Sequence, residues 1–198
     1  MRTDCSSRPR RFLARFTRAE RGATAVEFAL VSVPIFMLIF GLLEIAMVFL
    51  VGATLDQATQ AAGRLIRTGE FQTGATGAAI TPEGFKGLVC QRMTWLQSQC
   101  ASNLFLDVQT YTSYANLASA PPALDPATFD SANPNLCFKA GNGLDIVLVR
   151  AYYQWTLIAP GFNVTLQNMG AGKRLINSAT AFRNEPYNNL PPVGQACH

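Results

Sequence analysis

The longest apolar stretch of the chain runs from Phe28 to Val51 and contains one charged residue, Glu44. At about 1.5 Å per residue, a helix of this length covers roughly 36 Å, more than the ~30 Å of a bilayer hydrocarbon core. Such a run is too long and too apolar for a buried helix of a small soluble domain. The pattern therefore predicts a membrane-spanning helix over about residues 28–51.

Helical patterning continues beyond this span. Residues 56–67 are rich in good helix formers, and the apolar positions in and beside them share one face. These positions are Leu55, Ala58, Ala62, Leu65 and Ile66. Because Gly69 is a stop signal, we predict one helix over residues 23–68, its first half in lipid and its second half packed on a domain. Pro34 should kink this helix or be accommodated by its neighbours.

Residues 69–198 are expected to form a single domain. Thr81 and Pro82 are a helix start signal, and helical spacing continues to about Gln97. Strand patterns follow, and a long loop rich in Pro, Ala and Asn separates the first from the second. The expected strands cover residues 103–114, 144–157 and 174–183, and the loop covers 118–135. Helices followed by strands predict an α+β fold with a small antiparallel sheet, on which the N-terminal helix packs.

Charge is distributed unevenly along the chain. Residues 1–22 hold seven arginines against Asp4 and Glu20, whereas the remaining residues carry a net charge of −1. Because the basic segment directly precedes the apolar run, it indicates topology rather than nucleic-acid binding. We predict a cytoplasmic basic leader and a C-terminal domain across the membrane. A cleaved secretory signal would have a shorter apolar core, and the Arg10-Arg11 pair is only a faint twin-arginine signal.

Four of the five cysteines follow the span: Cys90, Cys100, Cys137 and Cys197. An even number of cysteines in an oxidising compartment predicts disulfides, and four cysteines allow three pairings. We favour Cys90 with Cys100, which closes a short loop, and Cys137 with Cys197, which ties the C-terminus to the domain. Free buried thiols are the alternative.

The sequence predicts no enzyme, no metal site and no cofactor. It contains no nucleophile elbow, no phosphate-binding glycine loop and no metal-ligand spacing. The carboxylates are scattered singly, and Asp107 and Asp145 are expected to be outward-facing or turn residues rather than halves of a catalytic dyad.

The most informative motif lies at the start of the apolar run. The segment Arg21-Gly22-Ala23-Thr24-Ala25-Val26-Glu27-Phe28 ends a basic stretch at a glycine and places a glutamate at the head of an apolar helix. An ionised side chain there is costly unless it is paired or stays at the headgroup level. Gly22 and Glu27 at this spacing resemble the processing site of type IV prepilins. Residues 21–69 as a whole resemble the TadE-like family, pilin-like proteins of the tight-adherence pilus system, and residues 181–187 are weakly similar to that family's C-terminal segment.

This resemblance implies a structural role in the inner membrane of a bacterium, with the domain in the periplasm. A prepilin peptidase would cut between Gly22 and Ala23, and Glu27 would neutralise the new α-ammonium group of a neighbouring subunit. The implied partners are the membrane, other pilin-like subunits, the pilus assembly machinery and the peptidase, with no nucleic acid. Small residues along the helix would permit close helix approach.

Two expectations stay open. Glu44 is interpreted either as an interfacial carboxylate that reaches toward water or as an intramembrane contact with another subunit. The alternative function is a permanently anchored periplasmic binding module that uses the aromatic residues Tyr152, Tyr153 and Trp155, which the same pattern also allows to be core residues.

Overall fold

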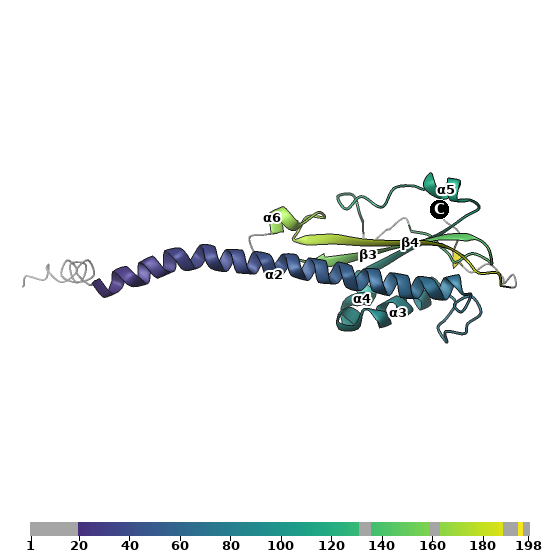
Figure 1. Ribbon diagram of the computed structural model, residues 1–198, viewed down its shortest axis with the longest axis horizontal. Helices are drawn as coiled ribbons and strands as arrows, with labels where there is room; N and C mark the ends of the chain where they lie inside the picture. Colours follow the sequence, from purple (N-terminus) through teal and green to yellow (C-terminus); the bar gives the residue numbers. More distant parts are fainter. Residues whose placement is uncertain (1–19, 131–135, 159–162, 188–193, 196–198) are drawn as a thin grey trace, which may run out of the picture. The chain divides into compact units, whose positions relative to one another are not determined.

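The computed structural model describes residues 20–130, 136–158, 163–187 and 194–195. It divides into two compact units between Leu43 and Glu44. The helix α2 (Glu20–Arg67) contributes to both units, and the second unit, which we call the body, begins at Glu44. Figure 1 shows the elements in chain order. The predicted helix over residues 23–68 is confirmed, and it is followed by Gly69 in a left-handed conformation, with φ of +80°.

Three short helical segments follow α2. They are α3 (Pro82–Arg92), the 3₁₀ turn η1 (Thr94–Leu96) and α4 (Gln97–Asn103). The hydroxyl of Thr81 accepts a hydrogen bond of 3.1 Å from the Gly84 amide, which confirms the predicted N-cap. The helix expected to continue to Gln97 is instead broken after Arg92, and Thr94 has a φ of 36°. The Cys90–Cys100 disulfide joins α3 to α4 across this break.

The strands form one sheet in the order β4-β3-β1-β2-β5. The three predicted strands correspond to β1 (Leu104–Tyr111), β3 (Ile146–Thr156) and β4 (Lys173–Arg183), and both β1–β3 and β3–β4 are antiparallel. The sheet is not purely antiparallel as expected, because the short strand β2 (Phe138–Lys139) runs parallel to β1. The long connection between these two strands, which contains α5 (Tyr114–Ala118), is what allows the parallel pairing.

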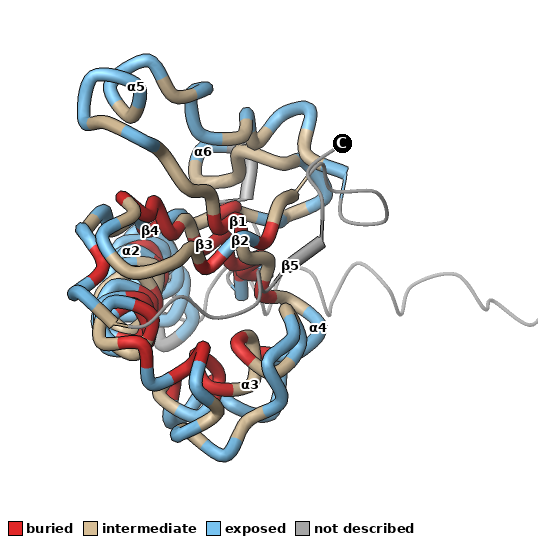
Figure 2. The backbone as a smooth tube through the Cα atoms, turned by 90° about the vertical axis from the view of Figure 1, so that its right-hand side faces the viewer, coloured by how far each residue is buried: buried red, intermediate tan, exposed pale blue. Residues whose placement is uncertain are grey.

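The sheet ends with β5 (Gly194–Gln195), which pairs antiparallel with β2. The one-turn helix α6 (Asn163–Leu166) precedes β4. Figure 2 shows that α3 and α4 lie on one side of the sheet and the segment with α5 on the other.

The part of α2 inside the body packs through the predicted apolar face. Its fully or almost fully buried residues recur at helical spacing, and all of them belong to the hydrophobic core. They are Val51, Leu55, Ala58, Ala62 and Ile66. Gly63 lies on the same part of the helix, where a Cβ atom would come within 3.0 Å of the Phe182 ring and 3.1 Å of the Thr180 methyl group. The glycine therefore lets α2 approach β4 closely.

The end of α2 is held by residues that follow β4. The Tyr187 hydroxyl accepts hydrogen bonds from the side-chain amides of Gln72, at 2.8 Å, and Asn184, at 2.9 Å. The Glu185 amide donates to the Arg67 carbonyl at 2.9 Å. Burial, with a contribution from the nearby Asp145 charge, raises the pKa of Tyr187 to about 12, so its hydroxyl stays protonated at neutral pH. Residues 184–187 thus bind the C-terminal end of α2 to the sheet.

Gly69 should be essential to this contact. Both Gly69 and Gly77 have positive φ, but a Cβ atom at Gly69 would lie 2.8 Å from the Tyr187 ring, whereas none of the described atoms lies within 4 Å at Gly77. We expect Gly69→Ala to lower the free energy of unfolding by about 1–3 kcal/mol more than Gly77→Ala, because only Gly69→Ala displaces a packed ring. Chemical denaturation of the two variants in the same detergent measures this difference. Equal losses would contradict the packing role of Tyr187.

Candidate assembly helix

The start of α2 contains the predicted processing and assembly residues. Gly22 and Ala23 both lie within the helical segment, and a Cβ atom at Gly22 would have no neighbour within 4 Å among the described atoms. The Glu27 side chain is exposed, and no hydrogen bond or ion pair joins it to another described residue. The structure therefore places Glu27 where a group from another molecule can reach it.

Before the body, the described residues form one apolar helix. Residues 24–43 cover about 30 Å at 1.5 Å per residue, which matches a bilayer hydrocarbon core. Its large apolar side chains, from Val26 to Leu43, are between 42% and 72% exposed. In the described part of the chain, α2 is the one helix long and apolar enough to cross a membrane. This is consistent with a single membrane anchor.

The predicted span of residues 28–51 overlaps the body. Val51, at its end, is fully buried in the core, whereas Phe49 is 77% exposed and Ile45 is 54% exposed. Along residues 44–51, α2 therefore has one face on the body and another that remains apolar and open.

A shallow apolar hollow lies on one face of the anchor. Its lining comes from residues spaced by a helical turn, including the small residues Ala25 and Ala29 and, at its end, Val33 and Pro34. Pro34 has no amide hydrogen to donate to the preceding turn, and α2 nevertheless continues through it. Small residues in such a hollow allow the side chains of a second helix to approach closely.

Glu44 lies at the first residue of the body and is only 3% exposed. Its two carboxylate oxygens accept hydrogen bonds from the Ile158 amide, at 3.2 and 3.0 Å, at the end of the segment that follows β3. Neither sequence interpretation of Glu44 included this internal contact. This backbone amide stabilises the carboxylate where the chain leaves the sheet.

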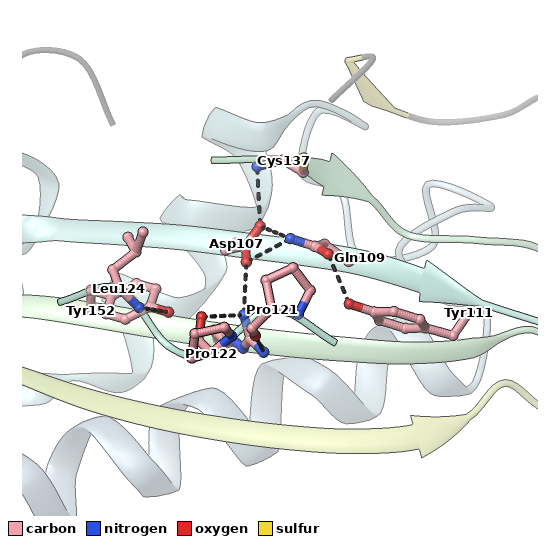
Figure 3. Close-up of polar contacts among 9 residues, drawn as sticks. Asp107, Gln109, Tyr111, Pro121, Pro122, Leu124, Cys137 and Tyr152 are labelled. Carbon is pink, nitrogen blue, oxygen red and sulfur yellow. Dashed lines mark hydrogen bonds and ion pairs between the residues drawn. The ribbon is translucent and has the colours of Figure 1, made fainter. Parts of the chain in front are cut away.

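A second polar group lies on the sheet face that carries the α5 segment. The Asp107 carboxylate accepts hydrogen bonds from the Cys137 amide, at 3.1 Å, and the Gln109 side chain, at 3.0 Å, and lies 3.8 Å from the Arg150 guanidinium (Figure 3). Arg150 in turn donates to the carbonyls of Pro121 and Pro122. Asp107 is therefore not simply the outward-facing residue that was expected, because it helps to hold β2 and the 121–122 segment on the sheet.

The three aromatic residues of the alternative binding module are buried. Tyr152 is 1% exposed, and its hydroxyl accepts a hydrogen bond from the Leu124 amide at 3.2 Å (Figure 3). Tyr153 and Trp155 belong to the hydrophobic core. These side chains pack the two faces of β3 and do not form an accessible aromatic surface.

The cysteine prediction is confirmed for one pair. Cys90 and Cys100 form a disulfide with a Cα–Cα distance of 5.5 Å. Cys137 is not a free thiol, but its favoured partner, Cys197, lies outside the described residues. The pairing of Cys137 with Cys197 therefore stays a prediction.

Within the described residues, the geometry defines one long apolar helix that continues into a small α+β body. The model of the TadE-like protein family matches residues 22–64, which confirms the resemblance over this segment. The match begins at Gly22, excludes the basic residues before it, and ends near the close approach of α2 to β4. No curated protein and no solved structure shows significant similarity to the chain.

The sequence contained partial signals for the contacts that it did not predict. Glu44 was conspicuous as a lone charge, but its partner is a backbone amide that no residue type identifies. Tyr187 lies in the segment that resembled the family's C-terminus, and its contact with Gln72 joins residues 115 positions apart. Such pairings become visible only after the chain has folded.

Removal of the Glu44 carboxylate should loosen the body next to the anchor. We expect Glu44→Ala to increase hydrogen exchange of the Ile158 amide and to cost about 1–3 kcal/mol of body stability, because the amide loses its acceptor. Glu44→Gln keeps one acceptor oxygen and should have a smaller effect. Glu27→Ala is the matched control, since it removes an exposed carboxylate from the same helix. Unchanged Ile158 exchange in Glu44→Ala would contradict the structural role.

Proposed function

We propose that this chain is a minor pilin-like subunit that helps to assemble a tight-adherence pilus. The TadE-like family is associated with that pilus system, and the observation that carries the proposal is the family match over residues 22–64. The match begins at the glycine after which a prepilin peptidase would cut. In this proposal the chain inserts with its basic leader in the cytoplasm and its body in the periplasm, and the leader is then removed.

The proposed assembly step is an electrostatic pairing of two helices. Cleavage after Gly22 would give Ala23 a free α-ammonium group at the start of an apolar helix. The exposed Glu27 carboxylate lies four residues after Ala23, so the two residues would lie on the same face of α2. A neighbouring subunit that approaches along this face would bring opposite charges together, and neither charge would remain alone in an apolar environment.

The anchor's surface supports the packing part of the proposal. Its apolar side chains are exposed all round, and the hollow lined by Ala25 and Ala29 lies close to Glu27 in the sequence. Helices in lipid associate through small residues and close van der Waals contact rather than through the hydrophobic effect. The same helix would therefore hold the subunit in the membrane and form its packing surface, so the proposed role is structural rather than enzymatic.

Processing can be tested at the mature N-terminus. When the chain is coexpressed with its prepilin peptidase, we expect Ala23 to be the first residue of the mature protein, as measured by intact mass and N-terminal sequencing. Gly22→Leu should remain full length, because a bulky side chain replaces the glycine at the cut site. An intact basic leader in cells that produce pili would disprove the processing step.

The role of Glu27 can be tested separately. We expect Glu27→Ala to abolish pilus assembly, measured in sheared surface fractions, while membrane insertion and leader removal remain normal. Glu27→Asp should restore part of the assembly, because it keeps the negative charge, and Glu27→Gln should not. Normal piliation of Glu27→Gln would rule out the charge pairing.

A further inference from the structure

The strand β4 is the outermost strand of the sheet, so one of its edges has no strand partner. Alternate residues of an edge strand direct their backbone groups toward the sheet and away from it. The Asn184 amide donates to the Asp145 carbonyl beside β3, whereas the Leu175 backbone bonds to Asn168 on the other side. With a continuous register from Lys173 to Arg183, the odd-numbered residues of β4 therefore direct their N–H and C=O groups outward.

The first half of this outer edge is already occupied by the chain itself. The Leu175 amide donates to the Asn168 side-chain oxygen at 2.7 Å, and the Leu175 carbonyl accepts from the Asn168 side-chain nitrogen at 3.1 Å. The Lys173 amide donates to the Gly170 carbonyl at 3.0 Å. The Asn168 amide group thus takes the place of a neighbouring strand, a form of protection that open edges usually require.

The second half of the edge has no such cover. Asn177, Ala179 and Ala181 are exposed, and no described residue hydrogen-bonds to their outward backbone groups. Their side chains are short, so they leave these groups accessible. A protected first half next to an open second half indicates a position at which another strand can bind.

The surroundings of the open edge specify the kind of partner. Lys173 and Arg174 lie at one end and Arg183 at the other, and β4 contains no acidic residue. Each arginine also donates one hydrogen bond within the chain, Arg174 to the Leu166 carbonyl and Arg183 to the Leu144 carbonyl. A groove beside the edge, between α2 and β4, is lined by Phe49, Gly52 and Asn177 among others, with Asp56 and Arg174 as its two charged residues. Two copies of β4 would bring basic residues together at the ends, so the charges favour a different, acidic partner.

We propose that the β4 edge from Asn177 to Ala181 binds an extended segment of another protein as an added strand. The segment would have β-branched or small residues at its centre and acidic residues at its two ends, opposite Arg174 and Arg183. Main-chain hydrogen bonds would supply the binding, and the terminal charges would select the partner and its position. This proposal concerns the body alone, so it stands whether or not the leader is cleaved.

The binding test uses the full chain in detergent micelles and two labelled peptides. Both peptides contain Val-Thr-Val-Thr-Val, with two Glu residues at each end in one and two Lys residues at each end in the other. We expect the acidic peptide to bind about ten-fold more tightly, as a few exposed ion pairs allow. Its binding should slow hydrogen exchange at the amides of Asn177, Ala179 and Ala181. Equal binding of the two peptides, or unchanged exchange at these amides, would overturn the proposal.

A matched pair of variants tests the edge itself. Ala179→Pro removes the outward amide at a position where an edge strand tolerates proline, and it should weaken the binding of the acidic peptide at least ten-fold. Ala179→Val keeps the amide and should bind like the parent chain. Slow exchange of the Ser178 and Thr180 amides checks that β4 still pairs with β3 in both variants. Equal binding by the two variants would contradict the proposal.

A change in the peptide provides the same test without altering the fold. An acidic peptide methylated at the amides that face β4 should bind at least ten-fold more weakly than its unmethylated form. Equal binding of these peptides would exclude strand addition. A second outcome would also overturn the choice of an acidic partner. If the chain forms a dimer that does not bind the peptide, and if Ala179→Pro abolishes that dimer, then the edge binds a second copy of the chain.

Discussion

The structure depends on a single helix that has to satisfy two different surroundings. From Val26 to Leu43 the large apolar side chains of α2 are exposed, as lipid requires, and from Glu44 onward one face packs into the core of the body. The change occurs without a break in the backbone hydrogen bonds of the helix. At this point the Glu44 carboxylate accepts the Ile158 amide and ties the helix to the end of the longest central strand.

The body holds this helix at two further places. Near the middle of its packed part, Gly63 permits contact with Thr180 and Phe182 of β4. At its C-terminal end, Gln72 and Asn184 both donate to the Tyr187 hydroxyl, and Arg67 bonds through its backbone to Glu185. These contacts span the packed length of α2.

The outer edges of β1 and β4 differ in how far other parts of the chain cover them. The β1 edge is covered by β2, and the Asp107 carboxylate accepts the Cys137 amide at the point where β2 arrives. The opposite edge, on β4, is protected only as far as Leu175. The unprotected part lies beside the α2 surface, so one side of the body presents both an open strand and exposed apolar helix residues such as Phe49. This is the side of the body on which we propose that an added strand binds.

The sequence alone predicted the long helix, the three main strands, the N-cap at Thr81 and the pairing of Cys90 with Cys100, because each depends on local periodicity, local capping or short spacing. The predicted roles of Gly22 and Glu27 also come from the sequence alone, because they rest on the spacing of these two residues along the chain. Only the tertiary structure decided three features that no local pattern predicts. They are the parallel pairing of β2 with β1, the burial of Tyr152, and the hydrogen bond from a backbone amide to Glu44. Each of these joins segments separated by dozens of residues, and the free energy that selects them arises only when the helix and the sheet pack together.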